Sequence, residues 1–169
     1  MIYANLSKYI NDNDVKGLKK FIRETYFSSF PIPKSIKYIK LDKEQELLPR
    51  AIKYNAVIKK YIYPLDFFKF KNTKGLDLNF WCDPNALMEK LEKLHNGVLL
   101  DTPVIRYDPI DNTDIGHEGR HRSLAYYIAG VQRMPILIMF FHFRSYIPVK
   151  KIDKRILRKF EPYEIYKKI

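Results

Sequence analysis

Apolar residues in the first part of the chain recur at helical spacing. Residues 11–27 place one apolar side chain in every three or four on a single face, with Asp12 or Asn13 as the N-cap. The stretch 42–62 has similar spacing and predicts a second helix, which Pro49 could break. We therefore expect the N-terminal part of the chain to be mainly helical.

The pattern predicts four further elements before position 98, one between these two helices and three after them. Alternation of apolar and polar residues at 35–41 predicts a strand. Residues 63–70 predict a short extended or turn segment, and 72–81 predict a loop that leads into a strand. The clearest helix is 83–97, because an Asp–Pro pair opens it, leucines line one face and Gly97 ends it.

The pattern changes to strands in the second half of the chain. Residues 102–108 predict a strand, 115–119 a very short one, and 120–130 a helix with small and apolar residues on its inner side. The continuous apolar run at 134–143 is typical of a strand that is covered on both faces. Because one helix joins the last two strands, we expect them to run parallel with a right-handed crossover.

These elements predict an α+β fold in a single domain, with a small mixed sheet flanked by helices. We expect a helical extension at 1–60 that packs on a core at 61–145. A basic helix and tail follow at 146–169. A chain of 169 residues is long enough for one domain with a sizeable core.

The charge of the chain adds a candidate partner. The net charge is +12, and it is concentrated at the two ends: residues 1–82 carry +8 and residues 145–169 carry +5, whereas residues 83–144 carry −1. Basic surfaces attract polyanions, so nucleic acid is an expected partner. The alternative is that lysine-rich faces only keep the chain soluble.

The composition also limits where the protein works. The one cysteine, Cys82, excludes an internal disulfide and is typical of a reducing, cytoplasmic setting. No run of 18 apolar residues occurs, so we expect no membrane span. The first residues lack the basic start and apolar block of a secretory signal.

The most unusual stretch is GHEGRHRS, residues 116–123, where a predicted strand runs into a predicted helix. Gly119 stands at the joint, where a glycine permits a positive φ and a close approach to the backbone. The first amides of a helix have no intrahelical partner, and with the helix dipole they favour an anion. Positive side chains in a first turn oppose that dipole, and such local conflict is typical of a functional site. We therefore expect a phosphate site formed by Gly119, Arg120, His121, Arg122 and Ser123.

The stretch GHEGRHRSLAYYIAGVQRMPILI resembles the signature of the ParB/sulfiredoxin-like fold. That signature is a glycine turn with His or Arg, a helix of small and apolar residues ending in Gly, and a strand containing Pro. The resemblance covers 98–141 well and 61–97 weakly. It implies the superfamily's fold and, for the form with Glu118, Gly119, His121 and Arg122, a ParB-like nuclease domain of mobile elements.

The resemblance also implies what the protein does not do. Arg120 stands where sulfiredoxins have their catalytic cysteine, so the chain is not a sulfiredoxin. The same residue replaces the glutamate of the ParB turn that binds the triphosphate of CTP, and His121 replaces its first arginine. Some archaeal relatives phosphorylate free serine with a nucleotide, which leaves a small-molecule kinase as an alternative.

The residues suggest roles for a phosphoester reaction, with Glu118 and His121 as the catalytic pair. Glu118 is the candidate general base or the contact to Mg²⁺ through water, and His121 donates to a phosphate oxygen or acts as general acid. Arg122 provides a two-pronged phosphate contact. A nucleoside triphosphate and Mg²⁺ are the implied cofactors. We expect no zinc, because Gly119 interrupts the spacing of His117 and His121.

Three functions therefore stay open: a ParB-like nuclease or NTPase, a non-catalytic DNA-binding accessory protein of a plasmid or virus, and the kinase. The sequence does not decide the oligomeric state. For either nucleic-acid function the expected contacts outside the turn are basic, and they are Arg106, Lys150, Lys151, Lys154 and Arg155.

Overall fold

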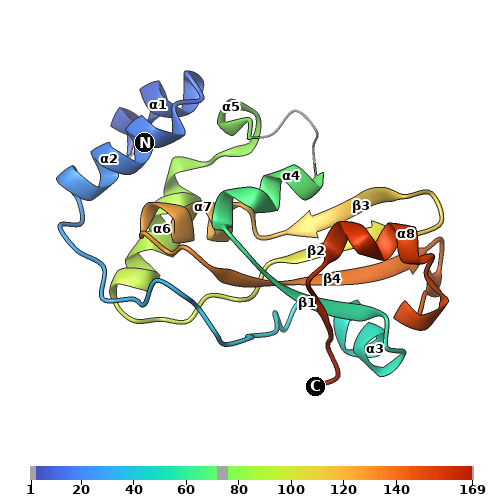
Figure 1. Ribbon diagram of the computed structural model, residues 1–169. Coiled ribbons are helices and arrows are strands. Elements are labelled where there is room, and N and C mark those ends of the chain that lie inside the picture. The colour runs from blue at the N-terminus through green and yellow to red at the C-terminus, as the bar shows by residue number, and fades with distance from the viewer. Residues whose placement is uncertain (1–2, 72–75, 169) are drawn as a thin grey trace. The chain divides into compact units, whose positions relative to one another are not determined.

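The computed structural model describes residues 3–71 and 76–168 (Figure 1). It confirms the α+β class, with helices and an open, mixed sheet. The chain forms two compact units that alternate along the sequence and do not follow the expected divisions at 60 and 145. A helical unit comprises Met1–Lys37, Tyr63–Leu100 and Arg120–Met134. A sheet unit comprises Tyr38–Ile62, Asp101–Gly119 and Pro135–Ile169.

The helical unit is organised around helix α7, which packs against α2, α4 and α6. Buried residues on α7 include Leu124, Ala125 and Ile128, and α6 contributes Leu87 and Leu91. The helices of this unit are α1 (Ser7–Asn11), α2 (Val15–Thr25), α4 (Phe67–Lys71), α5 (Leu78–Trp81), α6 (Pro84–His95) and α7 (Arg120–Ile128), with 3₁₀ turns at Ala4–Leu6 and Pro64–Asp66.

The sheet unit holds strands in the order β3-β2-β4-β1-β6, with β5 paired to β4. β2 runs parallel to β4 and antiparallel to β3, and β1 runs antiparallel to β6. The strands are β1 (Val57–Ile62), β2 (Val104–Asp108), β3 (Thr113–Glu118), β4 (Met134–His142), β5 (Ser145–Tyr146) and β6 (Glu164–Ile165). The helices of this unit are α3 (Leu47–Lys53) and α8 (Lys154–Leu157), with 3₁₀ turns at Val149–Lys151 and Arg158–Phe160.

Both faces of β4 are covered, as its continuous apolar run predicts. Leu137 and Met139 pack with helix α3 in one buried cluster. The next residue points to the opposite face, where Phe140 meets the ring of Phe160 at 5.7 Å. This second layer comes from the C-terminal segment, which is therefore part of the sheet unit's core.

The prediction of one helix over 42–62 is wrong. Only Leu47–Lys53 is helical, and Val57–Ile62 forms strand β1. Pro49 lies in the first turn of α3, where a helix tolerates a missing N–H, so it does not break the helix. Asn55 ends the helical run with a positive φ of 55°. The expected helical extension over 1–60 therefore contains part of a sheet strand.

Four shorter predictions in the first half also need correction. The segment 35–41 forms an isolated bridge between Ser35 and Arg133 but no regular strand. Residues 63–70 contain a 3₁₀ turn and the start of α4, where Phe67 and Phe68 pack inward, and the end of 72–81 forms helix α5; residues 72–75 lie outside the described chain. The N-cap of α2 is Asp14, whose Oδ1 accepts the N–H of Gly17 at 2.9 Å. The helix α6, its Asp83 cap and Gly97 are confirmed.

Two predictions about the second half need correction. Strands β3 and β4 do not run parallel: β3 is the hairpin partner of β2, and β4 runs parallel to β2 instead. The C-terminal segment is not one basic helix. It contains the short helix α8 and two 3₁₀ turns, because Pro162 cannot continue a helix, and it ends in β6, which extends the sheet beside β1.

Candidate functional site

The stretch Glu118–Ser123 crosses from one compact unit to the other. Strand β3 ends at Glu118, and helix α7 begins at Arg120. Glu118 and Gly119 belong to the sheet unit, and Arg120–Ser123 belong to the helical unit.

Position 119 requires a glycine, both for its backbone conformation and for the close packing around it. Its φ is +118°, a region that residues with a side chain rarely adopt. A Cβ added there would lie 2.6 Å from the Cβ of Pro103 and 2.9 Å from its Cα. This close packing is a structural reason for a glycine at position 119, in addition to the close approach of a ligand that the sequence predicts.

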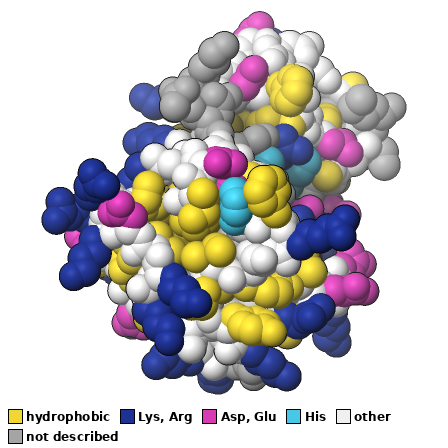
Figure 2. All heavy atoms as spheres, turned by 90° about the vertical axis from the view of Figure 1, so that its right-hand side faces the viewer, with side chains coloured by type: hydrophobic (Ala, Val, Ile, Leu, Met, Phe, Trp, Pro, Cys, Tyr) yellow, Lys and Arg dark blue, Asp and Glu magenta, His cyan; other side chains and the backbone are white. Residues whose placement is uncertain are grey.

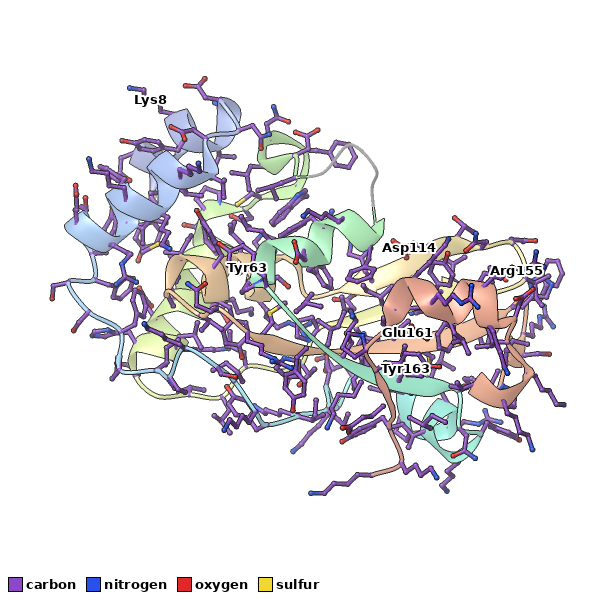
Figure 3. All side chains as sticks on the ribbon, viewed as in Figure 1. Lys8, Tyr63, Asp114, Arg155, Glu161 and Tyr163 are labelled. Carbon is purple, nitrogen blue, oxygen red and sulfur yellow. The ribbon has the colours of Figure 1, made fainter. Side chains whose placement is uncertain are left out.

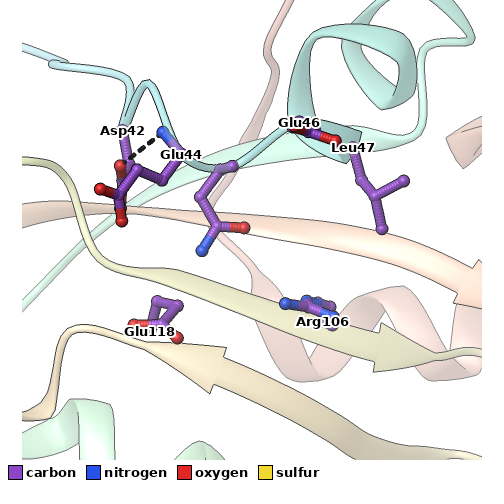
Figure 4. Close-up of a pocket in the computed structure, with 7 residues that line it drawn as sticks. Asp42, Glu44, Glu46, Leu47, Arg106 and Glu118 are labelled. Carbon is purple, nitrogen blue, oxygen red and sulfur yellow. Dashed lines mark hydrogen bonds between the residues drawn. The ribbon is translucent and has the colours of Figure 1, made fainter.

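Glu118 lines an acidic pocket of the sheet unit (Figure 4). The pocket has a volume of about 340 Å³. Arg106 is its one basic residue, and its side chain passes over Gly116, with Cδ 3.7 Å from where a Cβ would stand. The other lining residues are Asp42, Glu44, Gln45, Glu46 and Leu47. Four carboxylates against one guanidinium attract a cation rather than a phosphate.

The acidic pocket changes the expectation for Arg106. The segment before α3 folds back over β2 and β3, and the N–H of Glu44 donates to Oδ1 of Asp42 at 2.9 Å (Figure 4). Arg106 therefore lies among carboxylates, and the structure brings it together with Glu118. It does not lie on a basic surface of the kind that the prediction of a nucleic-acid contact requires.

In the helical unit, the first turn of α7 packs on Trp81. The guanidinium carbon of Arg120 lies 5.2 Å from the centre of the Trp81 ring, a cation–π geometry. Trp81 is in turn stacked on Phe68, with ring centres 5.3 Å apart. Arg120 is thus held by α5, the segment for which the sequence predicted a strand.

His121 is tied to the same segment. Its Nε2 accepts the backbone N–H of Asp83 at 3.0 Å, and its ring meets Trp81 edge-on at 5.0 Å. Burial lowers the pKa of His121, and Arg120 and Lys90 lower it further against the opposing effect of Asp83. The ring is therefore neutral at pH 7, with the proton on Nδ1. This arrangement fits a donor to a phosphate oxygen better than it fits a general acid.

Ser123 is the most unusual polar group of this turn. Its side chain is fully buried, and its Oγ has no hydrogen-bond partner among the described residues. Leaving a buried hydroxyl unpaired costs about 1–3 kcal/mol. The first turn of α7 contains no acidic residue, and Arg122 beside Ser123 is half-buried. The turn thus combines basic side chains, the backbone amides of a helix start and a buried hydroxyl that can donate to a ligand.

The predicted basic contacts at the C-terminus are exposed in the sheet unit. Lys150 and Lys151 lie in a 3₁₀ turn, and Lys154 and Arg155 begin α8. Arg155 (Figure 3) forms an ion pair of 3.1 Å with Asp153, which reduces its availability. On one face of the molecule, Lys and Arg side chains surround patches of hydrophobic residues (Figure 2).

Sequence reasoning missed a charged cluster at one end of the sheet. Nδ1 of His142 lies 2.7 Å from Oδ2 of the buried Asp108, whose Oδ1 accepts the N–H groups of Ile110 and Asp111. Asp111 also has a carboxylate oxygen within 4.8 Å of the other two side chains. His142 is 34 positions from Asp108, so no local pattern links them. The turn at 109–112 satisfies Asp108 structurally, as an Asx turn does.

The chain was compared with protein families, curated proteins and solved structures. No protein-family model, curated protein or solved structure matches the chain. Within the described parts of the chain, every helix is too short or too polar to cross a lipid bilayer.

Proposed function

We propose that the protein binds a phosphate group of a nucleotide or nucleic acid at the first turn of α7. The observation that carries this proposal is the buried, unpartnered Oγ of Ser123 in a turn that has Arg120 and Arg122 but, among its described residues, no acidic one. A phosphate oxygen would accept from Ser123 and from the backbone amides at the start of α7, while Arg122 would supply charge. The resemblance to ParB-like domains supports the same assignment.

We extend the proposal to phosphoester chemistry, as a nuclease or NTPase of ParB-like type in the cytoplasm. Glu118 supports this step, since a carboxylate two residues before the helix is a candidate base for activating water. The carboxylates around Glu118 are also ligands that Mg²⁺ prefers, so this pocket of the sheet unit is the candidate place for the implied ion. His121 contributes a neutral donor from Nδ1 in this scheme.

The single tryptophan provides a direct test of binding. Trp81 contacts both Arg120 and His121, so a ligand at the turn should change its fluorescence. Titration with inorganic phosphate, ATP and CTP should saturate in the wild type. Ser123→Ala and Arg122→Ala should weaken binding. Lys20→Ala, which removes an exposed charge from α2, serves as the control. Equal affinity in all four proteins would contradict the proposed site.

The catalytic step has its own test. Glu118→Gln should abolish Mg²⁺-dependent cleavage of DNA or hydrolysis of a nucleotide while leaving phosphate binding in place. Turnover that persists in this variant would exclude Glu118 as the base.

A non-catalytic nucleic-acid-binding protein is the second candidate. The exposed Lys150, Lys151 and Lys154 favour it, because phosphate contacts from lysine need no catalytic group. Wild-type protein that binds DNA in a salt-dependent manner, with no turnover under any metal condition, would favour this function over the enzyme.

A further inference from the structure

Two tyrosines form a stack on the sheet unit at the end of α3. The rings of Tyr54 and Tyr146 are 5.5 Å apart and inclined by only 15°. Tyr146 packs against the buried cluster of α3 and β4 and meets Phe141 edge-on at 5.3 Å. Tyr54 is 56% exposed. One aromatic ring is therefore anchored on the core and supports a second ring that remains open to solvent.

The backbone around Tyr54 holds this ring in place. Tyr54 is the C-terminal cap of α3, and its N–H donates to the carbonyl of Arg50 at 3.2 Å. Asn55 follows in a left-handed conformation, with φ of 55°, and the N–H of Ala56 returns to the carbonyl of Ala51 at 3.0 Å. The ring is thus presented by a fixed helix end and not by a long loop.

Lysines lie next to the stack from two directions. Lys53 is the last residue of α3 and is exposed. The N–H of Val149 donates to the carbonyl of Asn55 at 2.9 Å, which places the turn carrying Lys150 and Lys151 beside the end of α3 (Figure 1). Within the described chain, none of these three lysines takes part in an ion pair. They belong to a surface whose C-terminal part carries a net +5.

We propose that this face of the sheet unit binds single-stranded nucleic acid. A base stacks on the outer side of Tyr54, and Lys53, Lys150 and Lys151 contact the flanking phosphates. Single-strand binders combine a stacking ring with a positive surface in this way. A duplex keeps its bases stacked on one another, so it cannot offer a base face to Tyr54. The proposal shares nucleic acid as a partner with the proposed function but uses none of residues 118–123.

Fluorescence anisotropy with a labelled oligothymidylate tests the proposal. The wild type should bind this strand more tightly than a duplex of equal length, and more tightly than a strand of equal charge that lacks bases. Tyr54→Ala should weaken binding to the oligothymidylate roughly 5- to 100-fold. Tyr54→Phe, which keeps the ring, should bind nearly as the wild type does. Changing Lys150 and Lys151 to Gln should make the salt slope less negative by about 0.7 for each phosphate that a lysine no longer neutralises.

Controls separate this surface from the phosphate site. Phe80→Ala removes an aromatic ring that is 80% exposed elsewhere and should leave binding unchanged. Lys20→Ala removes an exposed charge from α2 and should leave the oligothymidylate affinity unchanged, whereas Arg122→Ala tests the phosphate site and should lose nucleotide binding. Unchanged affinity of Tyr54→Ala for the oligothymidylate would overturn the proposal. Equal affinity of the wild type for the duplex, or for the strand without bases, would also overturn it, independently of the result at α7. Loss of nucleotide binding by Arg122→Ala in the same experiment would leave the phosphate site supported.

Discussion

The backbone N–H of Asp83 donates a hydrogen bond of 3.0 Å to Nε2 of His121. Asp83 is also the N-cap of α6, where its side chain accepts the N–H of Asn85. The histidine of the predicted phosphate turn therefore fixes the point where α5 passes into α6. This relationship makes His121 a structural residue of the helical unit, whatever else it contacts.

Replacing His121 with Ala should lower stability. The change leaves the Asp83 N–H without its acceptor and removes the ring that packs on Trp81. We expect the free energy of unfolding to fall by about 1–3 kcal/mol, measured by urea denaturation at about pH 7.5, where the ring is neutral. Lys20→Ala is the control, because it removes an exposed side chain from the same unit. A His121→Ala protein as stable as the wild type would show that the bond contributes nothing.

The same bond predicts a pH dependence. The folded state lowers the pKa of His121 below its usual value of 6.5, so the unfolded chain binds the proton more readily. The stability that the neutral ring provides is complete above about pH 6.5 and is lost as the pH falls through the lowered folded pKa. Denaturation curves from about pH 7.5 down to about pH 5 should show this loss in the wild type and a smaller one in His121→Gln. Parallel curves for the two proteins would contradict the assignment.

Elements whose signals lie close together in the sequence were predictable, and elements that depend on distant residues were not. The helix α6 was predictable because Asp83, Pro84 and Gly97 are local signals. Strand β1 was not, because Val57–Ile62 reads equally well as helix and its partner β6 lies about a hundred positions away. The partner strand, and not a local preference, determines this segment.

The same distinction holds for the candidate site, part of which is contiguous in the sequence and part of which is not. The positive turn at 119–123 is contiguous, so its glycine joint and helix start were visible in the sequence. Its neighbours were not: Trp81 comes from a segment that was expected to be a loop and strand, and no local signal links the helix cap Asp83 to His121. The carboxylates around Glu118 come from a segment expected to be helical. The sequence could therefore suggest an anion site but not the acidic pocket next to its glutamate.

Asp108 should stabilise the sheet unit in an acid-sensitive manner. Burial acts to raise its pKa, but the His142 bond and the N–H groups of Asp111 and Ile110 outweigh it, and the pKa is lowered. The resulting stability is present above the usual value of 3.8 and is lost as the pH falls through the folded pKa. Asp108→Asn should cost about 1–3 kcal/mol at pH 7.

Urea denaturation of Asp108→Asn from about pH 7 to about pH 3 checks this expectation. The difference from the wild type should shrink toward the acid end, since the wild-type carboxyl becomes protonated there. Glu24→Gln serves as the control, because it neutralises an exposed carboxyl on α2. A difference that stays constant with pH would mean that the charge of Asp108 is not involved.

Cys82 should be unreactive in the folded protein. Burial, followed by the nearby charge of Asp83, raises the pKa of its thiol to about 12. The thiolate is the reactive form, so almost none is present at about pH 8. A thiol reagent at that pH should modify Cys82 only slowly in buffer and rapidly in denaturant. Fast modification of the folded protein would contradict the buried thiol and reopen redox chemistry.

Gly119 and Gly97 form a matched pair for the last prediction. Both have a positive φ, +118° and +76°, so an added Cβ strains the backbone at either position. At Gly97 nothing among the described residues lies within 4 Å of that Cβ, whereas at Gly119 it would overlap Pro103 at 2.6 Å. Gly97→Ala should therefore cost only the backbone strain, about 1–2 kcal/mol. Gly119→Ala must also displace the buried Pro103, next to strand β2, and we expect a clearly larger loss. Thermal and urea unfolding of the two variants compares them directly. If the costs were equal, the close approach to Pro103 would not restrict position 119, and the positive φ would be the structural reason that remains for its glycine.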